Sequence, residues 1–352
     1  MSERVLSLRE LNRATLARQL LLERRPLSAP RAIERLAAVQ AQWPTAPYVA
    51  LWSRVADFRR EALTRALERR QVVRSTLMRT TIHMVSARDY PVLGGLWRAR
   101  RREEFERQGG DVASAEIAAR AAIADGTRSY TELNAELGEI FSRRFGPLVP
   151  LAHLLPAGGW GHYRRTPLVE AERWLGRSFE EPGAGAGLLV ERYLAGYGPA
   201  SRADLLRFAG VRVKDVQPAL DALEPRLRRF RDEEGRTLLD FVRAPLPRAD
   251  IAPPVRFLGR WDNALLGYER RARILPDEYA ARQIGLAGDQ VFLVDGFVAG
   301  VWIVERATKA ATIVLEALAP LPQAARWAVE DEAGLLVRWH EPEADVHRVR
   351  WS

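Results

Sequence analysis

The sequence predicts an α+β protein in which tandem winged helix-turn-helix repeats precede a small β-barrel-like subdomain. Three observations lead to this prediction. A helix with a capping box opens the chain, helical segments alternate three times with short runs of strand-forming residues, and strand-forming runs dominate after a proline-rich linker at residues 243–254. We divide the chain into four units on this basis, namely residues 1–90, 91–182, 183–245 and 246–352.

The first unit is predicted from its helix signals. Ser7 and Glu10 have the spacing of a capping box, which starts a helix expected over residues 7–25, before Pro26. A second helix is expected over residues 28–39 and a third over residues 60–70. The stretch "QVVRSTLMRTTIHMV" then predicts two short strands, so that helices followed by a hairpin make a winged helix.

The second and third units repeat this order. The second unit is expected to have a long helix over residues 86–108, helices starting near residues 111 and 129, and an apolar helix near residues 148–155. In the third unit, a helix over residues 188–197 precedes "GPASRADLLRFAG", "VKDVQPALDALE" and the hairpin "RLRRFRDEEGRTLLDFV". A serine-capped helix, a glycine turn, a third helix and a hairpin are typical of a winged helix-turn-helix.

The last unit is rich in strand patterns. "VRFLGRW", "RARIL", "QVFLVDGFVAGVWIV" and "AATIVLEAL" predict strands, with a hairpin turn at Asp295 and Gly296. A short helix over residues 322–331 is expected before two more strands, "GLLVRWH" and "HRVRW". Together these elements predict a small, strongly bent sheet or barrel.

Composition limits the class of protein. Hydrophobic residues make up 47% of the 352, and there is no basic-then-apolar start or long apolar run, so we expect a soluble, cytoplasmic protein without membrane contact. The chain has no cysteine and five scattered histidines, so we expect no metal and no cofactor. The net charge is +9, and only Lys214 and Lys309 of the 54 basic residues are lysines. Codon bias and a polyanionic partner explain this charge equally well.

Two glutamines in "AVQAQWPTAPYVALWSRV" stand out. Residues two apart point in different directions on a helix but to the same side of an extended chain. Trp43 precedes Pro44, which favours extended backbone there. We therefore expect a helix ending near Val39 and then an extended turn with Gln40 and Gln42 on one side. The alternative is two polar residues at a helix end, one bonded to a free carbonyl and the other in water.

Four stretches together resemble the winged-helix DNA glycosylases of the AlkZ and YcaQ type. They are "LSLRELNRATLARQLL" with "AVQAQWPTAPYVALWSRV", then "VVRSTLMRTTIHMVSARDY", "VRFLGRWDNALLGYERRARIL" and "VFLVDGFVAGVWIV". The resemblance implies a C-shaped arrangement of three winged helices and a β-barrel around double-stranded DNA. It also implies cleavage of the N-glycosidic bond of N7-alkylated purines, in some members within bulky adducts or interstrand crosslinks.

The resemblance makes Gln40 and Gln42 the catalytic pair. In other members the second glutamine is an aspartate, and Gln42 here favours the branch associated with self-resistance. An N7-alkylated purine carries a positive charge and departs readily, so the enzyme needs no metal and no raised-pKa acid. Two amide carbonyls can orient a water at C1′ and face the cationic sugar. We expect a monomeric, monofunctional enzyme whose partner is DNA containing an alkylated purine.

The segment after Asp262 is the second candidate site, because the resemblance implies a hairpin that probes DNA near the lesion. Relatives carry a histidine where Tyr268 stands and an acid where Arg270 stands, so Tyr268 could instead stack on a base or sugar. The alternative is an Asx-turn followed by solvated arginines. The candidate DNA-binding residues of this segment are Asn263, Tyr268, Arg270, Arg271 and Arg273.

Three further DNA-binding candidates lie near the glutamines. Trp43 is either a core residue or a base-stacking plate, Arg79 lies on the expected wing within reach of phosphate, and His83 is either a structural or a DNA-contacting histidine. The third unit has an acidic third helix and is expected to be scaffold. A winged-helix regulator without chemistry is the alternative function, and a DNA-bending protein is a third; neither needs the glutamine pair on a turn.

Overall fold

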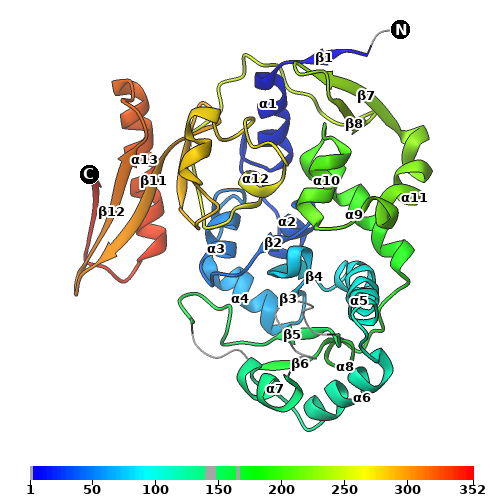
Figure 1. The fold of residues 1–352 in the computed structure, drawn as a ribbon. Helices are drawn as coiled ribbons and strands as arrows, with labels where there is room; N and C mark the ends of the chain where they lie inside the picture. Colours follow the sequence, from blue (N-terminus) through cyan, green and yellow to red (C-terminus); the bar gives the residue numbers. More distant parts are fainter. Residues whose placement is uncertain (1–2, 139–147, 164–166) are drawn as a thin grey trace.

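The computed structural model describes residues 3–138, 148–163 and 167–352. Its first part contains helices and then an antiparallel strand pair (Figure 1). The elements are α1 (Leu8–Arg18), α2 (Ala29–Arg35), α3 (Ala46–Trp52), α4 (Arg60–Glu68), β3 (Val72–Thr76) and β4 (Ile82–Ser86). The capping box of Ser7 and Glu10 is present, as predicted. Helix α1 ends at Arg18 instead of near residue 25, because Leu20 adopts a φ of +57° that turns the chain away.

The order of helices and strands repeats twice more. The middle part has α5 (Tyr90–Arg107), α6 (Val112–Ile123), α7 (Tyr130–Leu137), β5 (Leu151–His153), β6 (Leu168–Glu170) and α8 (Ala171–Leu175). The next has α9 (Pro182–Tyr197), α10 (Arg202–Ala209), α11 (Val213–Leu223), β7 (Leu227–Asp232) and β8 (Thr237–Phe241). The helix predicted at residues 148–155 is wrong, because β5 pairs with both β3 and β6.

One sheet joins the first two predicted units. Its strand order is β2-β4-β3-β5-β6, where β2 is Val39–Gln40, so β5 and β6 extend the sheet that the β3–β4 hairpin begins. A second sheet joins the first and third predicted units, since β1 (Val5–Leu6) runs parallel to β7 and places Val5 opposite Arg231. The predicted unit boundaries therefore do not separate the sheets.

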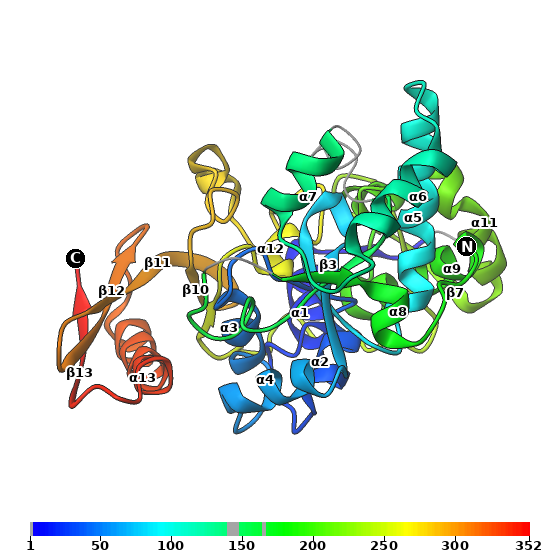
Figure 2. The same cartoon turned by 90° about the horizontal axis from the view of Figure 1, so that it is seen from below.

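The C-terminal part is an open sheet and not a barrel. Strands β9 (Arg256–Leu258), β10 (Val291–Val294), β11 (Phe297–Arg306), β12 (Ala310–Ala317) and β13 (Val346–Trp351) lie in the order β13-β12-β11-β10-β9. Within the described residues the outer strands β9 and β13 do not pair with each other, so the prediction of closure is wrong. Figures 1 and 2 both place β11, β12, β13 and helix α13 (Gln323–His340) at one end of the molecule.

Two predicted strands of this part are also wrong. "GLLVRWH" belongs to α13, whose buried residues Val329, Ala333, Leu336 and Val337 have helical spacing. "RARIL" forms turns after the short helix α12 (Asn263–Leu266). Helices α2 to α4 share a hydrophobic core with this sheet and α13, so the first and last parts of the chain are packed on each other.

Buried ion pairs fix these distant segments to one another. Arg18 binds Asp240 at 2.7 and 2.8 Å, and Arg54 binds Asp262 at 2.8 and 2.7 Å, with all four side chains at most 1% exposed. Removing one partner of such a pair leaves an uncompensated buried charge, at about 3–5 kcal/mol. The Arg54–Asp262 pair therefore holds the segment after β9 against the end of α3. Helix α3 directly follows the segment that bears the two glutamines.

Candidate functional site

The two glutamines lie just outside a helix, as predicted. Helix α2 ends at Arg35, four residues earlier than expected, and Ala37 takes a φ of +65° that redirects the chain. The chain then forms edge strand β2, in which Gln40 stands opposite His83 of β4. Gln42 follows in a bend before α3. The helix-end alternative is thereby removed, whereas joint action of the two amides stays a prediction.

The backbone around the glutamines is held from three sides. The amide of Ala41 donates to the carbonyl of Ile82 at 2.8 Å. The carbonyl of Ala41 accepts from Nε and Nη2 of Arg74 at 3.3 and 3.1 Å. The carbonyl of Ala38 accepts from Nδ2 of Asn263 at 2.6 Å. Because these groups come from β4, β3 and α12, the position of the glutamines depends on distant parts of the chain.

Arg74 is an unusual member of this set because its charge is buried. The residue is 5% exposed, and it forms no ion pair within the part of the chain that the structure describes. Burial lowers the pKa of its guanidinium to about 10. A buried cation whose contacts are the carbonyl of Ala41 and, at 3.5 Å, Nδ1 of His153 is costly for the fold, which points to a role in positioning Ala41. The sequence pattern assigned Arg74 only to a strand and gave no sign of this contact.

The two glutamine side chains differ in exposure. Gln42 is exposed, and its Oε1 accepts from the amide of Ile82 at 3.2 Å. Gln40 is 7% exposed, and its Oε1 is enclosed without a hydrogen-bond partner among the described residues. Gln42 is therefore the more accessible of the two amides.

An exposed aromatic cluster follows the second glutamine. Trp43 is 37% exposed, with its ring centroid 4.9 Å from that of Tyr163 and 5.0 Å from the guanidinium carbon of Arg260. An aromatic ring beside a cation can take up a base or a sugar-phosphate. Sequence reasoning found Trp43 but missed Tyr163 and Arg260, although Arg260 stands just before Trp261 and Asp262 in a stretch already singled out.

Two wing residues are less accessible than predicted. His83 is wholly buried, its Nδ1 lies 3.0 Å from the carbonyl of Thr81, and burial together with nearby Arg79 lowers its pKa to about 3. Arg79 donates to the carbonyl of Phe208 and lies over that ring, so the tip of the β3–β4 hairpin is packed on α10. DNA contact by these two residues stays a prediction, which would require His83 to become exposed and Arg79 to leave α10.

The segment expected to probe DNA is mostly interior. Tyr268 is 3% exposed, and its hydroxyl bonds Thr15 and the carbonyl of Tyr197 at 2.8 Å each. Arg273 is 4% exposed and lies over the Tyr268 ring at 4.0 Å. DNA contact by Tyr268 and Arg273 stays a prediction, and it would require both side chains to leave these interior contacts.

The remaining residues of that segment are also engaged. Asn263 is buried against Ala38, and Asp262 accepts from the amide of Ala264 at 2.9 Å, which is the Asx-type turn that we held as the alternative. Arg271 donates to the carbonyl of Ile284 at 2.6 Å, while Arg270 is exposed and paired with Glu234. Of the five candidates in this segment, Arg270 alone is exposed.

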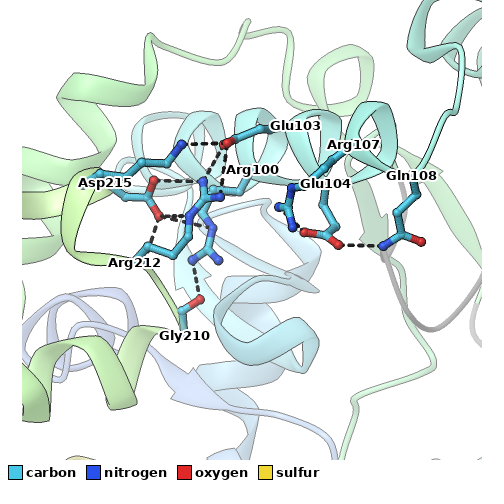
Figure 3. A network of polar contacts seen from close by, with 9 residues as sticks. Arg100, Glu103, Glu104, Arg107, Gln108, Gly210, Arg212 and Asp215 are labelled. Carbon is cyan, nitrogen blue, oxygen red and sulfur yellow. Dashed lines mark hydrogen bonds and ion pairs between the residues drawn. The ribbon is translucent and has the colours of Figure 1, made fainter.

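The start of α11 is tied to α5 rather than presented to solvent (Figure 3). Glu103 of α5 binds both Lys214 and Arg212, and Arg212 also binds Asp215. These charges are already paired, which agrees with a scaffolding role for the third unit. Within residues 3–138, 148–163 and 167–352, no cluster of acidic and histidine side chains is suited to a metal ion, and no helix is long and apolar enough to cross a membrane.

Comparisons with known proteins agree on one family. The family model described as DNA glycosylase AlkZ-like matches residues 33–339. The solved structure of the DNA glycosylase AlkZ of Streptomyces sahachiroi superposes with a TM-score of 0.78 at 21% sequence identity, covering 98% of this chain and 100% of that one. At that identity the likeness concerns the fold. A search of curated proteins gave no match.

Proposed function

Because the chain belongs to the AlkZ-like DNA glycosylase family, we propose that it hydrolyses the N-glycosidic bond of N7-alkylated purines with Gln40 and Gln42 as catalytic residues. The observation that supports this proposal is that hydrogen bonds fix the position of the backbone around Ala41. Hydrogen bonds from Arg74 and Asn263, together with the bond that Ala41 donates to Ile82, fix a short extended segment that bears two amides and opens to the surface at Gln42.

The proposed reaction requires few catalytic groups from the protein. Alkylation at N7 makes the purine a cationic leaving group, so the barrier lies in stabilising the oxocarbenium-like sugar and placing a water at C1′. Amide carbonyls are acceptors with a negative end, and they orient the water and face the sugar without removing a proton. The reaction then needs neither a metal nor a covalent intermediate, and the enzyme is monofunctional.

DNA is proposed to approach over the exposed cluster next to Gln42. Trp43, Tyr163 and Arg260 offer two ring faces and a guanidinium, and Trp43 directly follows Gln42 in the chain. Stacking of a base on such a surface contributes about 1–3 kcal/mol. Arg270, exposed on a neighbouring segment, is a further candidate for phosphate contact.

The finer features of the proposal follow from the resemblance. We propose that the three helix-and-hairpin parts act as winged-helix repeats, that the monomer clasps duplex DNA in a C shape, and that bulky natural-product adducts or interstrand crosslinks are among the substrates, in the service of self-resistance. A winged-helix regulator would need a free recognition helix, and the pairing of Lys214 and Arg212 with Glu103 argues against that alternative.

The test is release of N7-methylguanine from duplex DNA, followed as alkali-labile breaks at guanine. We expect Gln42→Ala to slow release by about 100-fold, comparable to loss of one preorganised group in other active sites, and Gln40→Ala to cost less. Gln108, the exposed residue that follows the last residue of α5, provides the matched control, and Gln108→Ala should leave release unchanged. Equal, negligible losses in both catalytic variants would refute the assignment.

A further inference from the structure

Two enclosed acceptor atoms face the same side of the central sheet. Gln40 and His83 stand directly opposite each other on β2 and β4, so their side chains project together. Oε1 of Gln40 and Nε2 of His83 are both shielded from solvent, and neither has a hydrogen-bond partner among the described residues. Buried polar atoms are seldom left unpaired, so this pair requires an explanation.

The protonation of His83 follows from its surroundings. Nδ1 lies 3.0 Å from the carbonyl oxygen of Thr81, which can only accept, so Nδ1 carries the hydrogen. Burial and the charge of Arg79 hold the pKa of the imidazole at about 3, so the ring is neutral at physiological pH. Nε2 therefore has a free lone pair and acts as an acceptor.

The second cross-strand neighbour of His83, Ser75, already forms hydrogen bonds with other groups. Ser75 of β3 is the other residue opposite His83, and its hydroxyl bonds the carbonyl of Leu151 at 2.7 Å and the hydroxyl of Tyr90 at 2.8 Å. Gln40 is thus the remaining cross-strand neighbour for Nε2. A half-turn of the terminal amide of Gln40 exchanges its oxygen and nitrogen without changing its shape, and it presents an N–H donor to His83.

We infer that His83 is a positioning residue for Gln40, whose Nε2 accepts an amide N–H of Gln40 and so turns the Gln40 carbonyl outward to the side of Gln42. The inference rests on the proposed function of the glutamine pair. With the carbonyl inward, the amide would present N–H groups, with their positive ends, to the cationic sugar. With the carbonyl outward, Gln40 can accept from the attacking water, and His83 acts without touching the substrate.

The first experiment is a double-mutant cycle measured by single-turnover base release. His83→Phe keeps the size of the ring and removes the acceptor, and we expect release to slow by about tenfold while DNA affinity is unchanged. The same substitution in a Gln40→Ala background should change the rate by less than about twofold, whereas in a Gln42→Ala background it should again cost about tenfold. An equal loss in the Gln40→Ala background would overturn the inference.

Two further measurements distinguish a loss of Gln40 positioning from misfolding of the His83→Phe variant. His83→Gln places an acceptor near the position of Nε2, and its rate should stay within about threefold of wild type. Nitrogen-15 NMR of the histidine rings of the unmodified protein should show His83 protonated at Nδ1 and bare at Nε2 between pH 8 and pH 5. A proton on Nε2 would overturn the inference. Failure of the proposed function would appear separately, as wild-type protein that releases no base.

Discussion

Replacing Arg74 with methionine should separate activity from stability. Burial lowers the pKa of Arg74 from 12.5 to about 10, which corresponds to about 3 kcal/mol. Because the folded pKa lies below the unfolded one, the fold bears this cost at neutral pH and loses it only as the pH rises from about 10 towards 12.5. Methionine removes the cost but leaves the buried carbonyl of Ala41 unpaired, at about 1–3 kcal/mol. The free energy of unfolding should therefore stay the same or rise by up to about 2 kcal/mol.

The rate of base release should respond far more strongly. Without the two hydrogen bonds from Arg74, the segment from Gln40 to Gln42 can shift, and a displacement of about 1 Å can cost about 100-fold in rate. Arg256 is the control, since burial and nearby Arg24 also lower its pKa to about 10. Within the described residues its hydrogen bonds go to the carbonyls of Leu21 and Val255 and, unlike those of Arg74, to a carboxylate, Glu332, and none goes to the glutamine segment.

The measurement is single-turnover release on methylated duplex DNA, with urea unfolding of the same samples. Arg74→Met should lose rate at equal or slightly higher stability, and Arg256→Met should keep its rate. The reasoning fails if Arg74→Met is strongly destabilised yet releases base at the wild-type rate, or if Arg256→Met loses as much rate as Arg74→Met.

Two further predictions concern stability. Tyr268→Phe should lower the free energy of unfolding by about 1–2 kcal/mol, because the hydroxyl bonds Thr15 and Tyr197 in the interior. DNA affinity should not change. Weaker DNA binding at unchanged stability would instead indicate that the hydroxyl contacts DNA. Burial lowers the pKa values of His83 and His153, so below pH 6.5 the unfolded chain binds protons that the folded chain does not. The free energy of unfolding should therefore fall as the pH is lowered from 6.5 towards 3, by up to about 1.4 kcal/mol per pH unit for each ring. His83→Phe should make this fall shallower in denaturation series between pH 7 and pH 5, and an unchanged slope would contradict the burial argument.

Local signals predicted the elements whose structure is decided locally. The capping box at Ser7, the helix start near Ser129, the serine-capped helix after Ser201 and the hairpin of the third unit depend on residues a few positions apart, and all are present. The glutamine segment was found in the same way, because Pro44 and the spacing of two restrict the backbone over a few residues.

Contacts between distant segments were beyond the sequence patterns. Residues 148–155 are apolar enough for a helix, but the open edge of β3 draws Leu151–His153 into a strand. The resemblance placed Tyr268 and Arg273 on a DNA-probing hairpin, whereas their polar groups bond Thr15 and Pro199 in the interior. Arg74 was missed for the same reason, since its partner Ala41 lies 33 residues earlier.

The sheet that β2, β4 and β3 share with β5 and β6 restricts how the protein can be re-engineered. Cutting out residues 91–182 as a cassette would take Leu151–His153 away from β3 and leave that edge of β3 unpaired, on the side away from β4 and β2. Unpaired strand edges can pair with strands of other molecules and so promote aggregation. Grafts that alter the middle of the chain should therefore retain these three residues and their alignment with Ser75, and confine changes to α6 and α7.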